Sequence, residues 1–484
     1  MPVIAAASSH TQLRPLLALL SALLVPGLAL GSEPPGQLLE EAAELRDRAF
    51  ADSDAWRHAW SLTTEVGPRP AGSAGDRAAV AWALSNLAEI GFDEIRPQAV
   101  NVSAWDRGTA EVSITQPFPQ NLVATALGRS IGTPQAGIEA PVIRFESLAE
   151  LESTTPEEVR GRVVFIDERM ERKRDGSGYG PAVQKRSSGP SAAAERGAVA
   201  LVIRSVGTSN NRLAHTGSLR YKEGIRRIPA FALSNPDADL LGAQFASGEE
   251  VRMYLHSTAR ELEPTRSANI IAEIRGAEKP DEIVIMGAHL DSWDLGTGAQ
   301  DNATGVAVLM EAARFIAMMP RRPARTVRLV LYANEERGLD GSRTYTAAAM
   351  QSGERHVIGI EADGGAGLIY RLDSGVAEKA FPVVAAMRKV VEPLGIAAGD
   401  NSATGGADLS TLRAEGMPVL SLRHDMTEYF DLHHSANDTL DKVDPGALRQ
   451  AVAAYAPLVW IAANVEDDFG DFPKQPATAT GGAR

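Results

Sequence analysis

Cysteine is absent from the 484 residues of the sequence. Its absence excludes disulfide bonds, a thiol nucleophile, thiolate metal ligands and a lipid-modified cysteine. A metal ion would therefore have to be bound by aspartate, glutamate or histidine, and histidine occurs only nine times. The Gly-x-Ser-x-Gly turn that many serine hydrolases place between a strand and a helix is also missing. Metal-dependent chemistry is thus favoured over a nucleophilic serine or cysteine.

Basic residues are too few to balance the acidic ones. The chain has 48 lysines and arginines against 62 aspartates and glutamates, a formal charge of −14. Because binding a polyanion requires a basic surface, nucleic acid is not expected as a partner. Hydrophobic residues make up 44% and charged residues 23%, which is ordinary for a globular protein and indicates neither a membrane bundle nor a disordered chain.

A long apolar run occurs at the N-terminus. Arg14 precedes apolar residues 15–30, and small residues follow around Ala29 and Gly31. This layout predicts a signal peptide over residues 1–31 and a secreted or periplasmic protein with no stable membrane anchor after signal cleavage. A retained anchor is the alternative, but Pro26 and Gly27 interrupt a run that barely reaches the ~20 apolar residues of a spanning helix.

The C-terminal half alternates apolar strands with helices. Strands are expected at 268–274, 282–288, 326–333, 356–362 and 418–422, and helices at 305–319, 341–350, 379–394, 409–415 and 445–464. This alternation predicts an α/β fold with a mostly parallel mixed sheet sandwiched by helices. Ligands of such sheets bind beyond the carboxyl ends of the strands.

Residues 121–265 follow a different pattern, with short β-type segments, many loops and one clear helix at 190–196. We predict an inserted β-rich domain here. The catalytic domain would then consist of residues 32–120 and 266–470, followed by a flexible tail over 471–484. A long excursion of the main domain is the alternative.

Side chains that can bind metals follow several of the predicted strands. His289 and Asp291 end one strand, and the two-residue period places them on the same side. A carboxylate often fixes the orientation of a histidine ligand, which suits Asp291. Asp301 follows in a glycine-rich loop directly before a helix, where it could equally be a helix cap.

The next strands end in further carboxylates. Glu335 and Glu336 are adjacent at a strand exit and point to opposite sides, so one can bind a metal while the other acts as a general base. Asp363 follows the next strand, and His434 lies on a loop before the last helix. Because carboxyl ends of parallel strands meet at one edge, these residues form a candidate site for two metal ions.

Four segments resemble the family of co-catalytic dizinc metalloexopeptidases, which includes aminopeptidases and glutamate carboxypeptidases. They are GAHLDSWDLGTGAQDNATGV, NEERGLDGS, EADGGAG and HHSANDTLDKVD, and the similarity extends to residues 67–73 and 126–138. The inserted segment resembles a protease-associated domain. The resemblance implies a zinc exopeptidase fold that carries such a domain as an insertion.

The resemblance also assigns roles to single residues. It implies that one Zn²⁺ is bound by His289 and Asp363, and the other by Glu336 and His434, with Asp301 bridging the two. Glu335 matches the general base of the family and Asp291 its supporting carboxylate. The resemblance further implies a cis peptide between Asp301 and Asn302, and His433 or Tyr429 as a group that steadies the oxyanion.

The implied reaction is hydrolysis of the terminal peptide bond of short peptides or dipeptides. Two Zn²⁺ ions per chain would lower the pKa of a shared water, whose proton Glu335 takes. A broad-specificity aminopeptidase of the same fold is the near alternative. A single-zinc enzyme acting on another amide or cyclising N-terminal glutamine, and a catalytically inactive binding protein, are the others. The resemblance also implies a homodimer.

Overall fold

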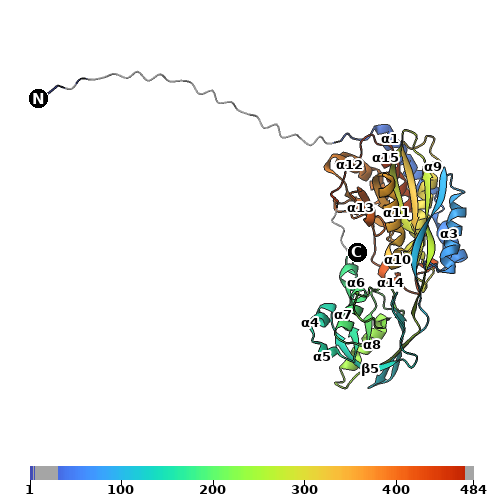
Figure 1. Ribbon diagram of the computed structural model, residues 1–484. Helices are drawn as coiled ribbons and strands as arrows, with labels where there is room; N and C mark the ends of the chain where they lie inside the picture. The colour runs from blue at the N-terminus through green and yellow to red at the C-terminus, as the bar shows by residue number, and fades with distance from the viewer. Residues whose placement is uncertain (4, 6–30, 475–484) are drawn as a thin grey trace.

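The computed structural model describes residues 1–3, 5 and 31–474. The part from residue 31 onward forms two lobes, each built on an eight-stranded sheet (Figure 1). Nearly all of the predicted signal peptide, and residues 475–484 of the predicted tail, lie outside the described residues. Within the described part, no helix combines the length and the apolar character needed to cross a membrane.

The larger lobe contains the sheet β1-β10-β12-β11-β13-β16-β14-β15. Its centre is parallel, since β11 pairs with β12 and β13, and β13 pairs with β16. β1 and β10 run antiparallel to their neighbours, and β14 is antiparallel to β16 but parallel to β15. The strands are β1 (Glu94–Asp106), β10 (Arg260–Ile274), β11 (Lys279–His289), β12 (Arg325–Tyr332), β13 (Arg355–Glu361), β14 (Ile369–Gly375), β15 (Ala397–Ala398) and β16 (Val419–His424). The predicted mixed α/β sheet is confirmed.

Helices cover both faces of this sheet because its central strands are apolar on both sides. Along β11, Val284 and Met286 belong to the main core, whereas Ile283 and Ile285 belong to the core on the opposite face. Each buried side chain of this size contributes about 1.5–3 kcal/mol. The first face packs against α1 (Gly36–Asp52), α2 (Ala55–Ser61), α3 (Ala74–Leu87), α9 (Thr304–Ala317), α12 (Phe381–Val391) and α15 (Pro445–Asn464); the second packs against α11 (Asp340–Ser352) and α13 (Ser410–Ala414).

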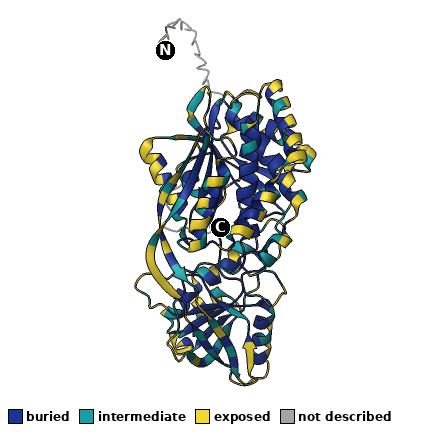
Figure 2. Cartoon of the chain, turned by 90° about the vertical axis from the view of Figure 1, so that its right-hand side faces the viewer, coloured by how far each residue is buried: buried dark blue, intermediate teal, exposed yellow. Residues whose placement is uncertain are grey.

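The long C-terminal helix illustrates how the sequence defines an element. Asp444 caps α15 by accepting a hydrogen bond from the Gly446 N–H, and Pro445 occupies the first turn, where its missing N–H costs nothing. From Ala447 to Ala463 nearly every residue is buried, which matches the dark interior of the larger lobe in Figure 2. The predicted bounds of this helix, 445–464, are confirmed.

The smaller lobe has the sheet β3-β2-β9-β5-β6-β7-β8-β4, in which β5, β6, β7 and β8 are parallel. Its strands are β2 (Ala110–Gln116), β3 (Gln120–Leu122), β4 (Ala124–Ala126), β5 (Ile138–Phe145), β6 (Val163–Ile166), β7 (Ala200–Arg204), β8 (Ala230–Leu233) and β9 (Arg252–Ser257). The domain boundaries at 121 and 265, and the resemblance to a protease-associated domain, stay predictions.

The expectation of a single clear helix in this segment is wrong. Besides α7 (Gly189–Glu195), the lobe contains α4 (Leu148–Ser153), α5 (Pro156–Val159), α6 (Tyr179–Ser187) and α8 (Asn235–Phe245). The physical reason is clearest in α6, which buries Ala182 and Val183 but also the basic Lys185 and Arg186. An apolar stripe that includes two charged side chains has no visible helical period in the sequence.

The lobes meet along the segment that carries α14 (Tyr429–Leu432), which Figure 1 shows at the junction. Tyr429 and Phe430 belong to a hydrophobic core of the smaller lobe. The Thr208 N–H donates to the Phe430 carbonyl at 3.0 Å, and the Thr216 N–H donates to the His434 carbonyl at 2.8 Å. Residues 429–434 are therefore positioned by both lobes.

Candidate functional site

The predicted ligands converge at the carboxyl edge of the central strands of the larger lobe. His289 is the last residue of β11, and Asp301 lies in η2 (Ala299–Ala303) at the start of α9. Glu335 and Glu336 begin α10 (Glu335–Gly338) directly after β12, and Asp363 follows β13. His434 reaches the same place from the segment after α14. Residues from five separate parts of the chain thus share one site.

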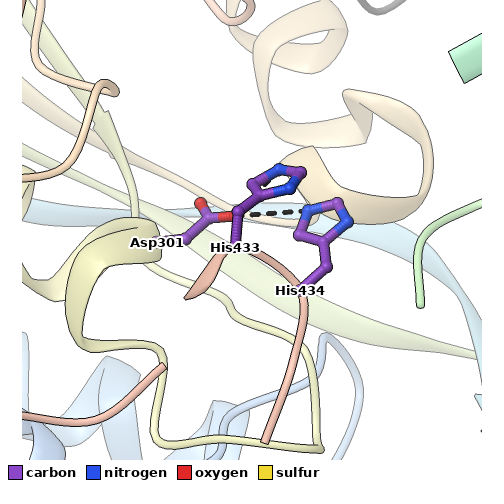
Figure 3. A group of neighbouring side chains, drawn as sticks. All are labelled: Asp301, His433 and His434. Atoms are coloured by element: carbon purple, nitrogen blue, oxygen red, sulfur yellow. Dashed lines mark ion pairs between the residues drawn. The ribbon is translucent and has the colours of Figure 1, made fainter. Parts of the chain in front are cut away.

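Asp301 lies between the two histidines. Its Oδ1 is 3.0 Å from His289 Nε2, and its Oδ2 is 3.2 Å from His434 Nε2. Figure 3 shows the second of these contacts, together with the neighbouring His433. The peptide bond between Asp301 and Asn302 is cis, as the family resemblance implies. One carboxylate therefore presents a different oxygen to each imidazole.

Each histidine has a second carboxylate partner. Asp363 Oδ1 is 3.4 Å from His289 Nε2, and Glu336 Oε2 is 2.9 Å from His434 Nε2. Two donors bound to one tetrahedral zinc ion at about 2.0–2.1 Å would be about 3.3 Å apart. The separations of 2.9–3.4 Å therefore suit donors that share a cation.

The electrostatics of the site also suit cations. Burial, followed by the nearby Asp301 charge, raises the pKa of Glu336 to about 7, and Glu336 Oε1 is buried with no hydrogen-bond partner among the described residues. Burial alone would lower the pKa of His434, but Glu336 and Asp301 raise it to about 9. A proton is thus held where carboxylates converge on an imidazole nitrogen, and a divalent cation can replace it. The residues present fit zinc.

His433 is a further neighbour of the bridging carboxylate. Its ring stacks on that of His434 with centroids 3.5 Å apart, and its Nε2 is 3.6 Å from Asp301 Oδ2. Among the residues that the structure describes, two triads of potential metal ligands have donor atoms within 4.8 Å of one another. One is Asp301, His433 and His434, and the other is His289, Asp301 and Glu336. The Tyr429 ring centroid lies 5.1 Å from that of His433, so both predicted oxyanion candidates are adjacent to the site.

Asp291 connects His289 with Glu335. The Asp291 carbonyl oxygen is 3.0 Å from His289 Nδ1, and its Oδ1 accepts a hydrogen bond from the Glu335 backbone N–H at 3.0 Å. Burial raises the pKa of Glu335 well above its usual value, reinforced by the charges of Asp363 and Glu336 and opposed by that of His289. A carboxyl group with a raised pKa can both accept and return a proton near neutral pH.

Two buried charged residues that the sequence did not predict as part of the site hold the Asp301 loop in place. Arg69, fully buried, donates to the carbonyl oxygens of Leu290, Thr297 and Gly298 at 2.6, 2.7 and 2.9 Å. Asp438 accepts from the Gln300 N–H at 2.6 Å and the Asp301 N–H at 3.2 Å. Both residues lie in segments that resemble the family, and this resemblance is the feature of the sequence that could have identified them.

Four residues of the smaller lobe were missed as well: Tyr179, Arg186, His215 and Thr216. Arg186 Nη1 is 3.4 Å from His434 Nδ1, and His215 Nδ1 is 2.7 Å from the His433 carbonyl oxygen. The Tyr179 ring lies edge-on to His433 with centroids 5.3 Å apart. These four residues belong to the smaller lobe, whereas most of the ligands belong to the larger one. No sequence motif therefore connects the two sets.

The comparisons with known proteins agree with this geometry. The family model "Peptidase family M28" matches residues 269–459. Carboxypeptidase Q from Rattus norvegicus is 33% identical over 406 residues, which are 84% of this chain and 84% of that protein, and the Homo sapiens protein is 32% identical with the same coverage.

Solved structures give the same result. A Peptidase M28 precursor from Shewanella amazonensis SB2B is 49% identical with a TM-score of 0.89, covering 91% of this chain and 99% of that one. A zinc aminopeptidase from Bacillus subtilis is 18% identical with a TM-score of 0.62, covering 86% of this chain and 97% of its own, and so shares the fold.

Proposed function

Because the chain belongs to peptidase family M28, we propose that it removes terminal residues from short peptides or dipeptides at a centre of two zinc ions. The chain is a zinc metallopeptidase of the exopeptidase type and is close to carboxypeptidase Q. The number of metal ions, the mechanism and the substrate are the parts that we propose.

The observation that carries this proposal is the position of Asp301, with one oxygen 3.0 Å from His289 Nε2 and the other 3.2 Å from His434 Nε2. In the proposed centre His289 and Asp363 would hold one ion, Glu336 and His434 would hold the other, and Asp301 would contribute to both. All are buried or half-buried, so water competes little for the ligands. A complete ligand set also argues against an inactive binding protein.

When bound, two zinc ions lower the pKa of a water molecule and polarise the scissile carbonyl. Glu335 accepts the proton of the attacking water and delivers it to the leaving amine. Its raised pKa suits both steps, and the hydrogen bond from its backbone N–H to Asp291 fixes its position. Asp291 also orients His289 through the Nδ1 side of the ring.

The preference for short peptides is supported by the position of the site at the junction of the lobes. Residues of the smaller lobe contact His433 and His434 directly, so a substrate bound at the site would lie between residues of both lobes. Such a position favours a short peptide over a long one. The name carboxypeptidase Q of the relatives favours action at a free carboxyl end. An aminopeptidase is the second candidate, favoured by the fold shared with the Bacillus subtilis enzyme.

The test compares one dipeptide with its N-acetylated and its C-amidated forms, read by release of free amino acid, on protein whose zinc content has been measured. Cleavage of the N-acetylated but not the amidated form supports a carboxypeptidase. The reverse result supports an aminopeptidase, and cleavage of the unmodified form alone supports a dipeptidase. Failure to cleave any of the three, with two zinc ions bound, contradicts the proposal.

We also propose that the chain is exported and forms a homodimer. The apolar segment after Arg14 supports export. Cell fractionation and N-terminal sequencing of the mature protein test the first proposal, with cleavage expected near Gly31. Light scattering of the purified protein tests the second, and a monomer at micromolar concentration contradicts it.

A further inference from the structure

The two histidines of the proposed zinc centre differ on the ring side that faces away from Asp301. His289 Nδ1 faces acceptors, with the Asp291 carbonyl oxygen at 3.0 Å and the Asp291 Oδ1 at 3.7 Å. His434 Nδ1 faces a cation, since Arg186 Nη1 is 3.4 Å away. The centre is therefore symmetric in its ligands and asymmetric in what supports them.

Arg186 is built into this place. Its side chain is only 4% exposed, Nη1 donates to the Thr216 carbonyl oxygen at 3.2 Å, and Nη2 donates to Tyr179 Oη at 2.7 Å. A Cβ atom on Gly217 would lie 2.1 Å from Nη1, so any side chain at position 217 would force the guanidinium to move.

The charge of Arg186 is not neutralised by a neighbour. Among residues 31–474, no carboxylate forms an ion pair with it, and its Nε is buried without a hydrogen-bond partner. Burying an unpaired charge is costly. Some buried arginines of this chain have a carboxylate partner, whereas Arg69, like Arg186, has none among the described residues. Of the paired ones, Arg204 is 2% exposed and lies 2.5 Å from Asp167.

The chemistry of the two ring nitrogens makes this contact unfavourable for a bound cation. A neutral imidazole that binds metal through Nε2 carries its proton on Nδ1, and an acceptor there strengthens the ligand. Asp291 supplies that acceptor for His289. Arginine has donors only, so it cannot accept from His434, and its positive charge opposes a cation on the far side of the ring.

The wider surroundings follow the same asymmetry. Asp408 is 1% exposed, neither of its carboxyl oxygens has a hydrogen-bond partner among the described residues, and it lies within electrostatic range of His289 and Asp363. Near His434 the neighbours are instead imidazoles, with the His433 ring stacked at 3.5 Å and His215 bonded to the His433 carbonyl. An additional buried carboxyl group therefore lies beside the His289 half of the centre, whereas additional imidazoles lie beside the His434 half.

We propose that Arg186 is a positioning residue that weakens cation binding at His434 and Glu336, so that zinc fills the His289 and Asp363 position first. This inference rests on the proposed two-zinc centre. The zinc ion at His434 and Glu336 is then the more weakly bound and exchangeable one. The fraction of protein that carries it depends on the zinc concentration.

The test titrates zinc into the mature chain after removal of metal, using a chromophoric chelator as competitor. The wild-type protein is expected to bind two ions in two separate steps. Arg186→Met removes the charge and should tighten the weaker step about 10- to 100-fold without changing the tighter one. Arg186→Lys keeps the charge and should keep the steps apart.

Two further variants assign the steps to positions. Glu336→Gln should abolish or weaken the weaker step, and Asp363→Asn should weaken the tighter one. Arg204→Met is the matched control, because it removes a buried arginine of the same lobe whose ion pairs are with Asp167 and Asp239 rather than with a proposed ligand, and it should leave both steps unchanged. Circular dichroism of each metal-free variant checks folding, and Arg186→Gln replaces the methionine variant if that one is unfolded.

The outcomes separate the two proposals. Wild-type protein that binds fewer than two zinc ions contradicts the proposed function. Two ions bound with equal affinity, or an Arg186→Met variant that changes neither step or both equally, contradicts only the role of Arg186. A variant with unchanged zinc affinities but a raised KM for a dipeptide with a free carboxylate would make Arg186 a substrate-binding residue and overturn the inference.

Discussion

Replacing Glu335 with glutamine tests the proposed proton transfer most directly. The variant keeps the side-chain volume, and its backbone N–H can still donate to Asp291 as it does at 3.0 Å in the wild type. Glutamine cannot accept the proton of water, which removes a general-base contribution of about 10²–10⁴ in kcat. That loss corresponds to about 2.7–5.4 kcal/mol of activation free energy.

The same substitution makes a second, opposite prediction for stability. Burial raises the pKa of Glu335 well above its usual value, so its ionisation in the folded metal-free protein is unfavourable at neutral pH. Glutamine removes this penalty, and we expect the metal-free variant to unfold at a higher temperature than the wild type at pH 7. Loss of activity would therefore accompany a gain in stability.

The assay measures kcat by amino-acid release from a dipeptide, zinc content by metal analysis, and the unfolding temperature by circular dichroism. Glu428→Gln is the control, since Glu428 is an exposed glutamate next to α14 and should change none of the three. A Glu335→Gln variant with full zinc and a kcat within about threefold of wild type would refute the assignment of the base. Loss of zinc together with activity would make Glu335 a ligand instead.

Three other predictions concern the ligands and their support. His434→Ala should lower the zinc content from two ions to one per chain, measured by metal analysis, and retention of two ions would exclude His434 as a ligand. Arg69→Met should reduce the free energy of unfolding in urea by about 3–5 kcal/mol, because it removes four hydrogen bonds to a charged group and leaves carbonyl oxygens buried; a change below about 1 kcal/mol would contradict this. Without metal, the unfolding temperature should fall as pH rises from about 5 to 9, because the raised pKa values of Glu336, about 7, and His434, about 9, favour their protonated forms in the folded state. Saturating zinc should flatten this slope, and a metal-free protein with no slope would contradict the pKa values.

The larger lobe was predictable because its core obeys simple periodicity. The apolar run that forms β11 and the capped helix α15 are evident in the sequence, and strands that alternate with helices allow few arrangements. The family resemblance and the zinc-dependent enzyme class that it implied are confirmed. The roles of the individual ligands stay predictions that agree with the geometry.

The surroundings of the ligands were not predictable, for two physical reasons. Arg186 and His434 are 248 positions apart, and nothing local in either segment indicates their contact. The helix that carries Arg186 buries basic side chains, so its sequence has the composition of a surface loop. Arg69 was hidden for a similar reason, because a fully buried arginine among prolines reads as a solvent-exposed turn.

The backbone hydrogen bonds from Thr208 and Thr216 to the segment 429–434 have a mechanical consequence. They tie the imidazole of His434 to the smaller lobe, whereas the carboxylate that it faces belongs to the larger one. A cation shared by Asp301 and His434 would therefore add a link between the lobes at the site itself. Removal of the cation would abolish that link, while the backbone hydrogen bonds from Thr208 and Thr216 would remain.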